Sequence, residues 1–194
     1  MCARVSLIYH PNEAAEVKIG PRPSEATGTA RLKPRTDGAN AWGADHLLLF
    51  HINAGGATGY ETHVYEKCSA ELLRVAQIIH AEVAGVFKAQ GLPDRGIKKT
   101  NLHMTRESKM PAALLEFGFI DNGKDAALLK DQVFLQKVAE AAARGVAKAY
   151  RLKRKVGVEK PTAPQPQLKE EPKMKVDDAN KIIRVLQDKW NVVT

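Results

Sequence analysis

The stretch His46-Leu-Leu-Leu-Phe-His51-Ile-Asn53-Ala-Gly-Gly56 decides the fold of this 194-residue chain. Residues 46–52 form an apolar run that is typical of a buried strand, and the two glycines predict a turn directly after it. Residues 60–65 alternate in character, which predicts a second strand that can form a neighbouring pair with the first.

Strands and helices alternate in the remainder of the central region. Ser69 can cap a helix whose apolar positions recur at helical spacing as far as Phe87. Residues 112–117 predict a further strand, and residues 125–130 and 132–150 predict two more helices. This alternation indicates an α/β layer structure.

The two ends of the chain differ from the centre in composition. In residues 1–31 we expect one strand at 5–9 and then irregular chain, because prolines and glycines interrupt any periodicity. Residues 152–176 are rich in Lys and Pro and predict an extended linker. Residues 177–194 contain a short amphipathic segment, so the globular domain is expected to occupy residues 32–151.

Composition excludes several classes of protein. No apolar run approaches the roughly 20 residues of a membrane span, and the first residues lack a convincing signal-peptide cleavage site, so export would need another route. Cys2 and Cys68 are too few and too distant for a disulfide framework, so we expect free thiols.

The net charge of +8 favours polyanionic surroundings, which include both nucleic acids and the phosphate-bearing polymers of bacterial walls. Aromatic residues make up only 6% of the chain and do not interleave with basic residues as a base-stacking surface requires. Nucleic-acid binding is therefore the weaker prediction.

His51 is a candidate metal ligand because it stands at the end of a buried strand, which is a rigid mount. Neutral imidazole is a good donor to zinc. The alternative is a structural histidine held by hydrogen bonds.

Glu116 is a candidate acid/base residue. It follows four apolar residues in the segment 110–122, and an ionised carboxylate in such surroundings needs a cation, a metal-bound water or a hydrogen-bond network. An apolar environment would also raise its pKa toward the range that suits a general base. A structural salt bridge is the alternative interpretation.

The stretches that contain His51 and Glu116, residues 46–56 and 110–122, resemble the zinc-dependent N-acetylmuramoyl-L-alanine amidases of type 3, which occur as autolysins and phage endolysins. The similarity continues through residues 58–65, 94–98, 106–111 and 139–150, and it covers roughly residues 33–150. It implies a twisted mixed sheet flanked by helices and hydrolysis of the amide bond between N-acetylmuramic acid and L-alanine in peptidoglycan. It further implies Zn as cofactor, His51 as a zinc ligand and Glu116 as the catalytic acid/base.

The N-terminal part departs from the family pattern. Family members begin with a Gly-His-Gly-Gly turn that gives the first zinc histidine, followed by a glutamate ligand, and neither motif is present here. His10 could replace the histidine, and Glu13, Glu16 or Glu25 the glutamate. A truncated or frame-shifted gene with N-terminal elements partly missing accounts for this departure, and an inactive remnant that only binds peptidoglycan is then the rival hypothesis.

Further residues receive secondary assignments. Asn53, Arg106, Gly55 and Gly56 either line a substrate groove or serve turns and surface solvation. We expect His63 to lie in a strand beside His51 as a partner of the zinc histidine. The remaining histidines, at positions 46, 80 and 103, are expected to be partly exposed structural residues.

The resemblance also gives the tail and the location an interpretation. Residues 177–194 resemble the start of a truncated wall-binding module, and the expected location is the bacterial cell wall or the extracellular space. For a phage endolysin, the expectation is cytoplasmic residence until holin-type release.

Overall fold

The computed structural model describes residues 5–9, 15–16, 32–42, 46–152 and 192–193. The elements, in chain order, are β1 (Val5–Tyr9), β2 (Ala15–Glu16), α1 (Leu32–Trp42), β3 (His46–Asn53), β4 (Tyr60–Tyr65), α2 (Ala70–Ala89), β5 (Asp94–Thr100), α3 (His103–Arg106), β6 (Ala112–Phe119), α4 (Gly123–Leu128), α5 (Gln132–Ala149) and β7 (Val192–Val193). The strands and helices predicted between residues 46 and 150 are confirmed. The predicted linker and most of the C-terminal segment lie outside the described residues.

Five strands form one mixed sheet in the order β1-β3-β6-β4-β5. The pairs β3/β6 and β4/β5 are parallel, whereas β1/β3 and β4/β6 are antiparallel. The prediction that β3 and β4 are neighbours is therefore wrong, because β6 lies between them. All eight residues of β6 are buried, which suits a central strand, and the connection from Ala54 to Gly59 is long enough to cross two strand spacings of about 4.8 Å each.

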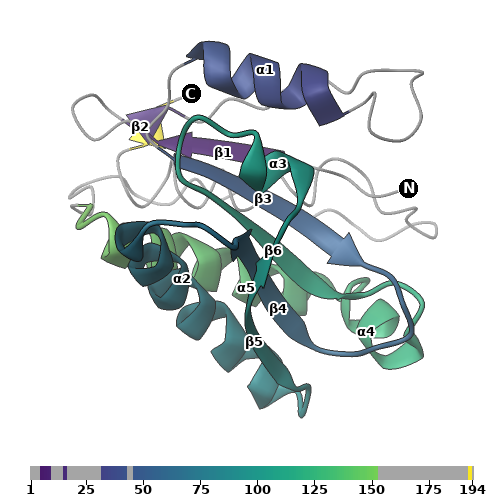
Figure 1. Cartoon of the computed structure of the whole chain (residues 1–194). Coiled ribbons are helices and arrows are strands. Elements are labelled where there is room, and N and C mark those ends of the chain that lie inside the picture. The colour runs from purple at the N-terminus through teal and green to yellow at the C-terminus, as the bar shows by residue number, and fades with distance from the viewer. Residues whose placement is uncertain (1–4, 10–14, 17–31, 43–45, 153–191, 194) are drawn as a thin grey trace.

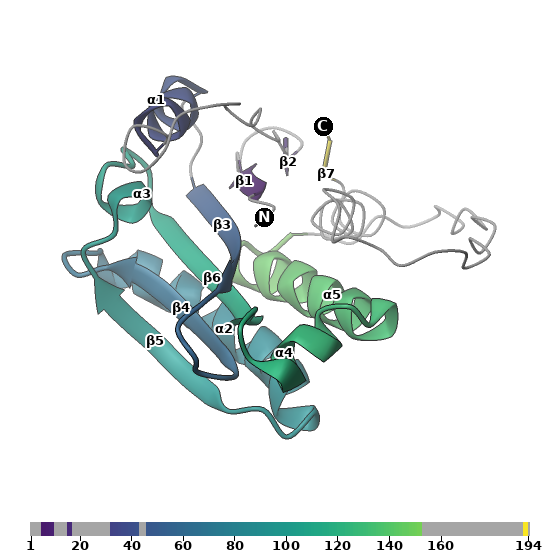
Figure 2. The ribbon, with the colours of Figure 1, turned by 90° about the vertical axis from the view of Figure 1, so that its right-hand side faces the viewer.

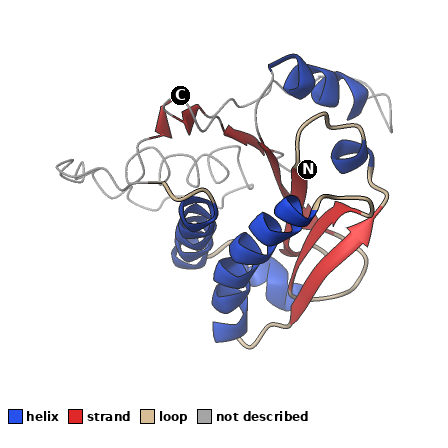
Figure 3. Ribbon diagram, turned by 60° about the vertical axis from the view of Figure 1, so that its left-hand side comes forward, coloured by secondary structure: helices blue, strands red, loops and turns tan. Residues whose placement is uncertain are grey.

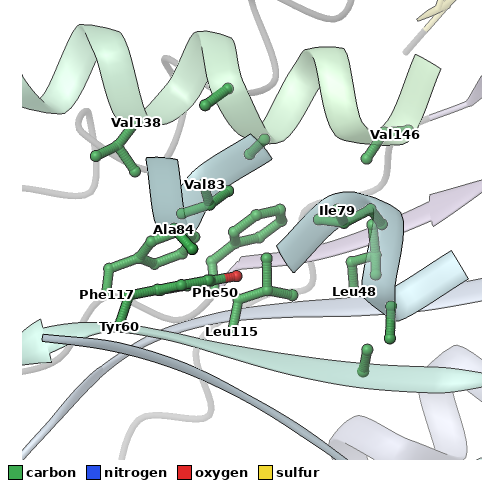
Figure 4. Packing of buried hydrophobic residues seen from close by; sticks show 14 of the residues in the cluster. Leu48, Phe50, Tyr60, Ile79, Val83, Ala84, Leu115, Phe117, Val138 and Val146 are labelled. Carbon is green, nitrogen blue, oxygen red and sulfur yellow. The ribbon is translucent and has the colours of Figure 1, made fainter. Parts of the chain in front are cut away.

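Helices α2 and α5 cover one face of the sheet (Figure 1). Side chains from alternate strand positions, among them Leu48, Phe50 and Leu115, pack against the apolar stripes of both helices (Figure 4). The predicted cap of α2 is confirmed, since Ser69 Oγ accepts a hydrogen bond from the Leu72 amide at 3.1 Å. This face is the main hydrophobic core of the domain.

A smaller apolar cluster covers only part of the opposite face. Leu49 and Leu114 of the sheet pack there with Met104 of α3 and with Ala39 of α1. Both short helices lie on the side of the sheet away from α2 and α5 (Figures 1 and 2). Beyond this cluster, toward the carboxyl ends of β3 and β6, the same face carries His51 and Glu116.

Five elements were not predicted, namely α1, α3, β5 and the two-residue strands β2 and β7. Helix α1 contains Pro34 and Gly38, which lower helix propensity, but Pro34 lies in the first turn, where a proline is tolerated. Strand β5 carries several charges and shows little apolar alternation, as suits the edge strand of a sheet. In both segments the surroundings in the folded domain outweigh the local pattern.

The α/β class and the mixed sheet flanked by helices are confirmed, and Figure 3 shows the helices on both sides of the strands. Among the described helices, none has the length and apolar content that crossing a membrane requires. A second, two-stranded parallel pair joins β2 to β7.

Candidate active site

One row of side chains crosses four adjacent strands at the polar end of the sheet. In the register, His51 of β3 stands opposite Glu116 of β6, and Glu116 stands opposite Glu61 of β4. Residues directly opposite each other point to the same face of a sheet. Arg95 of β5 extends the row, because its Nε donates a hydrogen bond to Glu61 Oε2 at 2.8 Å.

His51 and Glu116 are close together and largely buried. His51 Nδ1 lies 3.8 Å from Glu116 Oε1, and the two side chains are 13% and 11% exposed. β3 and β6 run parallel, so both side chains lie at the same end of the sheet, toward the carboxyl ends of these strands. An imidazole and a carboxylate in a largely dry setting interact more strongly with charge than they would in water.

Glu61 is the centre of a hydrogen-bond network beside Glu116. Its Oε1 accepts from Asn53 Nδ2 at 2.8 Å and lies 3.1 Å from His63 Nε2, while its Oε2 accepts from Arg95. Burial raises the pKa of Glu61, but the hydrogen bonds from Arg95 and His63 outweigh burial and hold the pKa below its usual range. Glu61 therefore stays ionised beside the Glu116 carboxyl group.

Two irregularities in the strands shape this end of the sheet. The β4/β5 register shifts between Tyr60 and Thr62, so that the backbone at Arg95 and Gly96 bulges, with a φ of 76° at Gly96. The β3/β6 register shifts between His51 and Asn53, next to Gly118, whose φ is 81°. As a result, the Arg95 guanidinium lies 5.1 Å from the centroid of the Phe119 ring.

The connection from Ala54 to Gly59 is held beside the row by two carboxylates. Asp121 Oδ2 accepts hydrogen bonds from the amides of Gly55 and Gly56 at 2.7 and 2.8 Å. These two bonds hold the pKa of Asp121 below its ordinary value. Asp125, which is buried, accepts from the Thr58 hydroxyl at 2.6 Å and from the Gly59 amide at 2.9 Å.

Residues 13–148 match the family described as N-acetylmuramoyl-L-alanine amidase. The chain belongs to this amidase family. It is 44% identical over 124 residues to the N-acetylmuramoyl-L-alanine amidase CwlM of Bacillus licheniformis, a match that covers 64% of this chain and 48% of the relative. It is 43% identical over 129 residues to the endolysin of Bacillus phage SPP1, with 65% of this chain and 48% of the relative covered.

Solved amidase structures resemble the chain in fold. The catalytic domain of the N-acetylmuramoyl-L-alanine amidase CwlV from Bacillus (Paenibacillus) polymyxa var. colistinus is 34% identical, with a TM-score of 0.56 over 63% of this chain and 66% of that one. The N-acetylmuramoyl-L-alanine amidase of Clostridium difficile 630 is 32% identical, with a TM-score of 0.56 over 60% of this chain and 63% of that one. The chain spans about half the length of the curated amidase relatives named above.

The structure brings some of the sequence-predicted residues of this amidase-family chain together and separates others. His51 and Glu116 are adjacent, and Asn53 donates a hydrogen bond to Glu61, which stands opposite Glu116. Arg106 instead bonds Glu107 and Asn101, away from this network. Gly55 and Gly56 form the turn and donate their amides to Asp121.

The expectations for the other histidines require corrections. His63 does not lie in a strand next to His51, and its ring nitrogens face Glu61 and Thr100 instead. His80 is buried rather than partly exposed, with Nδ1 2.9 Å from the Thr62 hydroxyl and Nε2 2.8 Å from Asp94 Oδ1. Strand order explains the first error, because β6 lies between β3 and β4.

The fit to a zinc ion can be tested on the donor groups. Catalytic zinc normally has three protein ligands. The described residues contain no group of three or more His, Cys, Asp or Glu that could hold a metal, so they do not supply a full set. His10, Glu13 and Glu25 lie outside the described residues, and nothing is described of the Glu16 side chain.

Glu61 and Arg95 were missed as site residues, although both lie in segments that carried the family resemblance. The only signal in the sequence was a polar pair, Glu61 and His63, two residues apart in one strand, which places both on one face. Their relation to Glu116 depends on strand order, which the sequence pattern did not reveal.

Proposed function

We propose that this chain is the catalytic part of a peptidoglycan hydrolase that cleaves the amide bond between N-acetylmuramic acid and L-alanine. The observation that carries the proposal is the distance of 3.8 Å between His51 Nδ1 and Glu116 Oε1, at the carboxyl ends of β3 and β6. The chain that holds this pair belongs to the amidase family. The bacterial cell wall is then the partner and the place of action.

Glu116 is the proposed general acid/base. As a carboxylate, it takes a proton from the attacking water and then delivers that proton to the departing nitrogen of L-alanine. Its position suits this role, because the side chain is largely buried and stands between an imidazole and the ionised Glu61.

Zinc is the proposed cofactor, and His51 is the described residue that would bind it. When bound, such an ion would supply Lewis acidity toward the substrate carbonyl. The remaining ligands would have to come from residues outside the described set or from Glu16, in keeping with the candidates His10, Glu13 and Glu25.

The first test replaces Glu116 by Gln, which keeps the shape of the side chain but removes its proton transfer. We expect the variant to clear bacterial cell walls in a zymogram at least about 100-fold more slowly than the unmodified chain. Glu71→Gln, an exposed change on α2, is the matched control and should clear normally. Retention of the chain on cell walls without any clearing by the unmodified protein would refute the amidase and favour the wall-binding alternative.

The second test measures zinc directly, independent of catalysis. After growth with added zinc, we expect about one metal ion per chain in the purified protein and a clear loss of metal in His51→Ala, because an imidazole donor is removed. His103→Ala is the control, since His103 faces Thr36 near the short helices. A zinc content near zero in the unmodified chain would remove the metal from the proposal, and equal zinc in both variants would remove His51.

A further inference from the structure

Arg95 stands at the end of the four-strand row and is held in a fixed orientation from two sides. Its Nε donates to Glu61 Oε2 at 2.8 Å, and its guanidinium lies 5.1 Å from the centroid of the buried Phe119 ring. An arginine that is both bonded and stacked loses little further freedom when it binds a ligand. Its orientation is therefore set before any ligand arrives.

The same guanidinium has donors to spare. A guanidinium carries five N–H donors. Within the described part of the chain, the hydrogen bonds of Arg95 run from Nε to Glu61 and none runs from its two terminal nitrogens. The side chain is 34% exposed, so these nitrogens can meet solvent or a ligand.

Arg95, on the edge strand β5, supplies the positive charge beside the buried carboxylate of Glu61. Glu61 is only 7% exposed at its side chain and accepts three polar contacts, so a single Arg95 bond suffices to complete its Oε2. The planar fork of a guanidinium matches a carboxylate in two parallel hydrogen bonds, which a lysine ammonium cannot do. The free edge of Arg95 is thus suited to a second carboxylate, supplied from outside the chain.

The position of Arg95 relative to Glu116 sets where that carboxylate must lie. β5 and β6 are separated by β4, and two strand spacings amount to roughly 10 Å. An extended peptide advances about 3.3–3.6 Å per residue. A group bound by Arg95 would therefore belong to a substrate residue two or three positions from the bond next to Glu116.

We propose that Arg95 determines specificity by binding a carboxylate of the peptide stem, two or three residues from the cleaved amide, with Glu61 and Phe119 as its positioning residues. The inference rests on the proposed function, because it places the cleaved bond at Glu116. Arg95 would then select peptides with a free carboxylate near the glycan over peptides in which that group is a carboxamide.

Equilibrium binding tests this inference without turnover. The probes are two N-acetylmuramoyl peptides with amidated C-termini, identical except that the free carboxylates of the second and third amino acids are either both present or both converted to carboxamides. Binding is measured calorimetrically to the full chain carrying Glu116→Gln. We expect the carboxylate peptide to bind about 10- to 100-fold more tightly, since hydrogen bonds to charged groups are the strong ones.

Variants at position 95 then separate recognition from folding. Arg95→Gln should lose this preference for the carboxylate peptide while binding the carboxamide peptide unchanged, and Arg95→Lys should retain only part of it. The carboxamide peptide reports on folding, because a damaged domain would lose both ligands. Arg74→Gln is the matched control, as Arg74 lies on α2 and bonds Glu71.

Several outcomes would overturn the inference. These are equal binding of both peptides by the Glu116→Gln chain, no binding of either, or an equal loss of both in Arg95→Gln, which would make Arg95 merely structural. Failure of the proposed function would give a different result from failure of this inference. The unmodified chain would cleave neither peptide, while the Arg95-dependent preference in binding would persist.

Discussion

Asp125 shows how a single buried carboxylate can fix the surroundings of a site. It is 1% exposed, and it accepts hydrogen bonds from the Thr58 hydroxyl and from the amides of Gly59 and Phe119. Three donors compensate the loss of water that a buried charge would otherwise suffer. Asp125 thereby joins the β3–β4 connection, the end of β6 and the first turn of α4.

Gly59 completes this arrangement at the start of β4. Its φ is 95°, and a Cβ atom there would lie 2.1 Å from the Pro93 carbonyl oxygen, so no other residue fits. The close approach brings the beginning of β4 against the beginning of β5. Glu61 and Arg95, each two residues further along, come together for this reason.

The contact between α2 and α5 depends on one small residue. A Cβ atom at Gly145 would lie 2.7 Å from the Ile79 Cα atom, so the two helix backbones meet there without a side chain between them. We predict that Gly145→Ala lowers the free energy of unfolding by about 1–3 kcal/mol, because the packed helices must separate. Chemical denaturation followed by circular dichroism measures the change.

Gly85 provides the matched control within the same helix pair. It lies exposed in α2 without a positive φ, and a Cβ atom added there would meet no other atom within 4 Å. Gly85→Ala should therefore stabilise the domain by about 0.5–1 kcal/mol through the better helix propensity of alanine. If Gly145→Ala stabilised the domain as Gly85→Ala does, helix propensity rather than the helix contact would govern position 145.

The parts of the molecule that could be predicted from sequence are those in which local pattern and packing agree. The apolar run of β3 and the helical spacing of α2 indicated their elements. His51 followed from its place at the end of that apolar run, and Glu116 followed from the apolar residues before it in the segment that forms β6. β5 escaped prediction because an edge strand needs few apolar residues. The network of Glu61 and Arg95 escaped because it depends on β6 lying between β3 and β4, a long-range pairing without a local signal.

Two carboxylates whose pKa values are lowered in the folded state, those of Glu61 and Asp94, make the stability of the domain depend on pH. Burial raises the pKa of Asp94, but hydrogen bonds from His80 and the Gly96 amide outweigh burial and lower it, and the pKa of Glu61 is lowered by Arg95 and His63. A carboxylate whose pKa is lower in the folded state stabilises that state at pH values above its ordinary pKa. This contribution is lost as the pH falls through the folded-state pKa.

The double variant Glu61→Gln, Asp94→Asn tests this link across the molecule. The unmodified domain should hold its free energy of unfolding above about pH 5 and lose it as the pH falls further, since these side chains must take up protons as the domain unfolds. The double variant should be less stable at pH 7 but decline less on acidification, so that the two curves converge toward pH 3. Urea denaturation at pH 7, 5, 4 and 3 measures both, and Asp37→Asn, Glu66→Gln, which alters exposed carboxylates, should run parallel to the unmodified chain. An equally steep decline in the Glu61 and Asp94 variant would place the acid sensitivity in other groups, because neither of its altered side chains can then be taking up the protons.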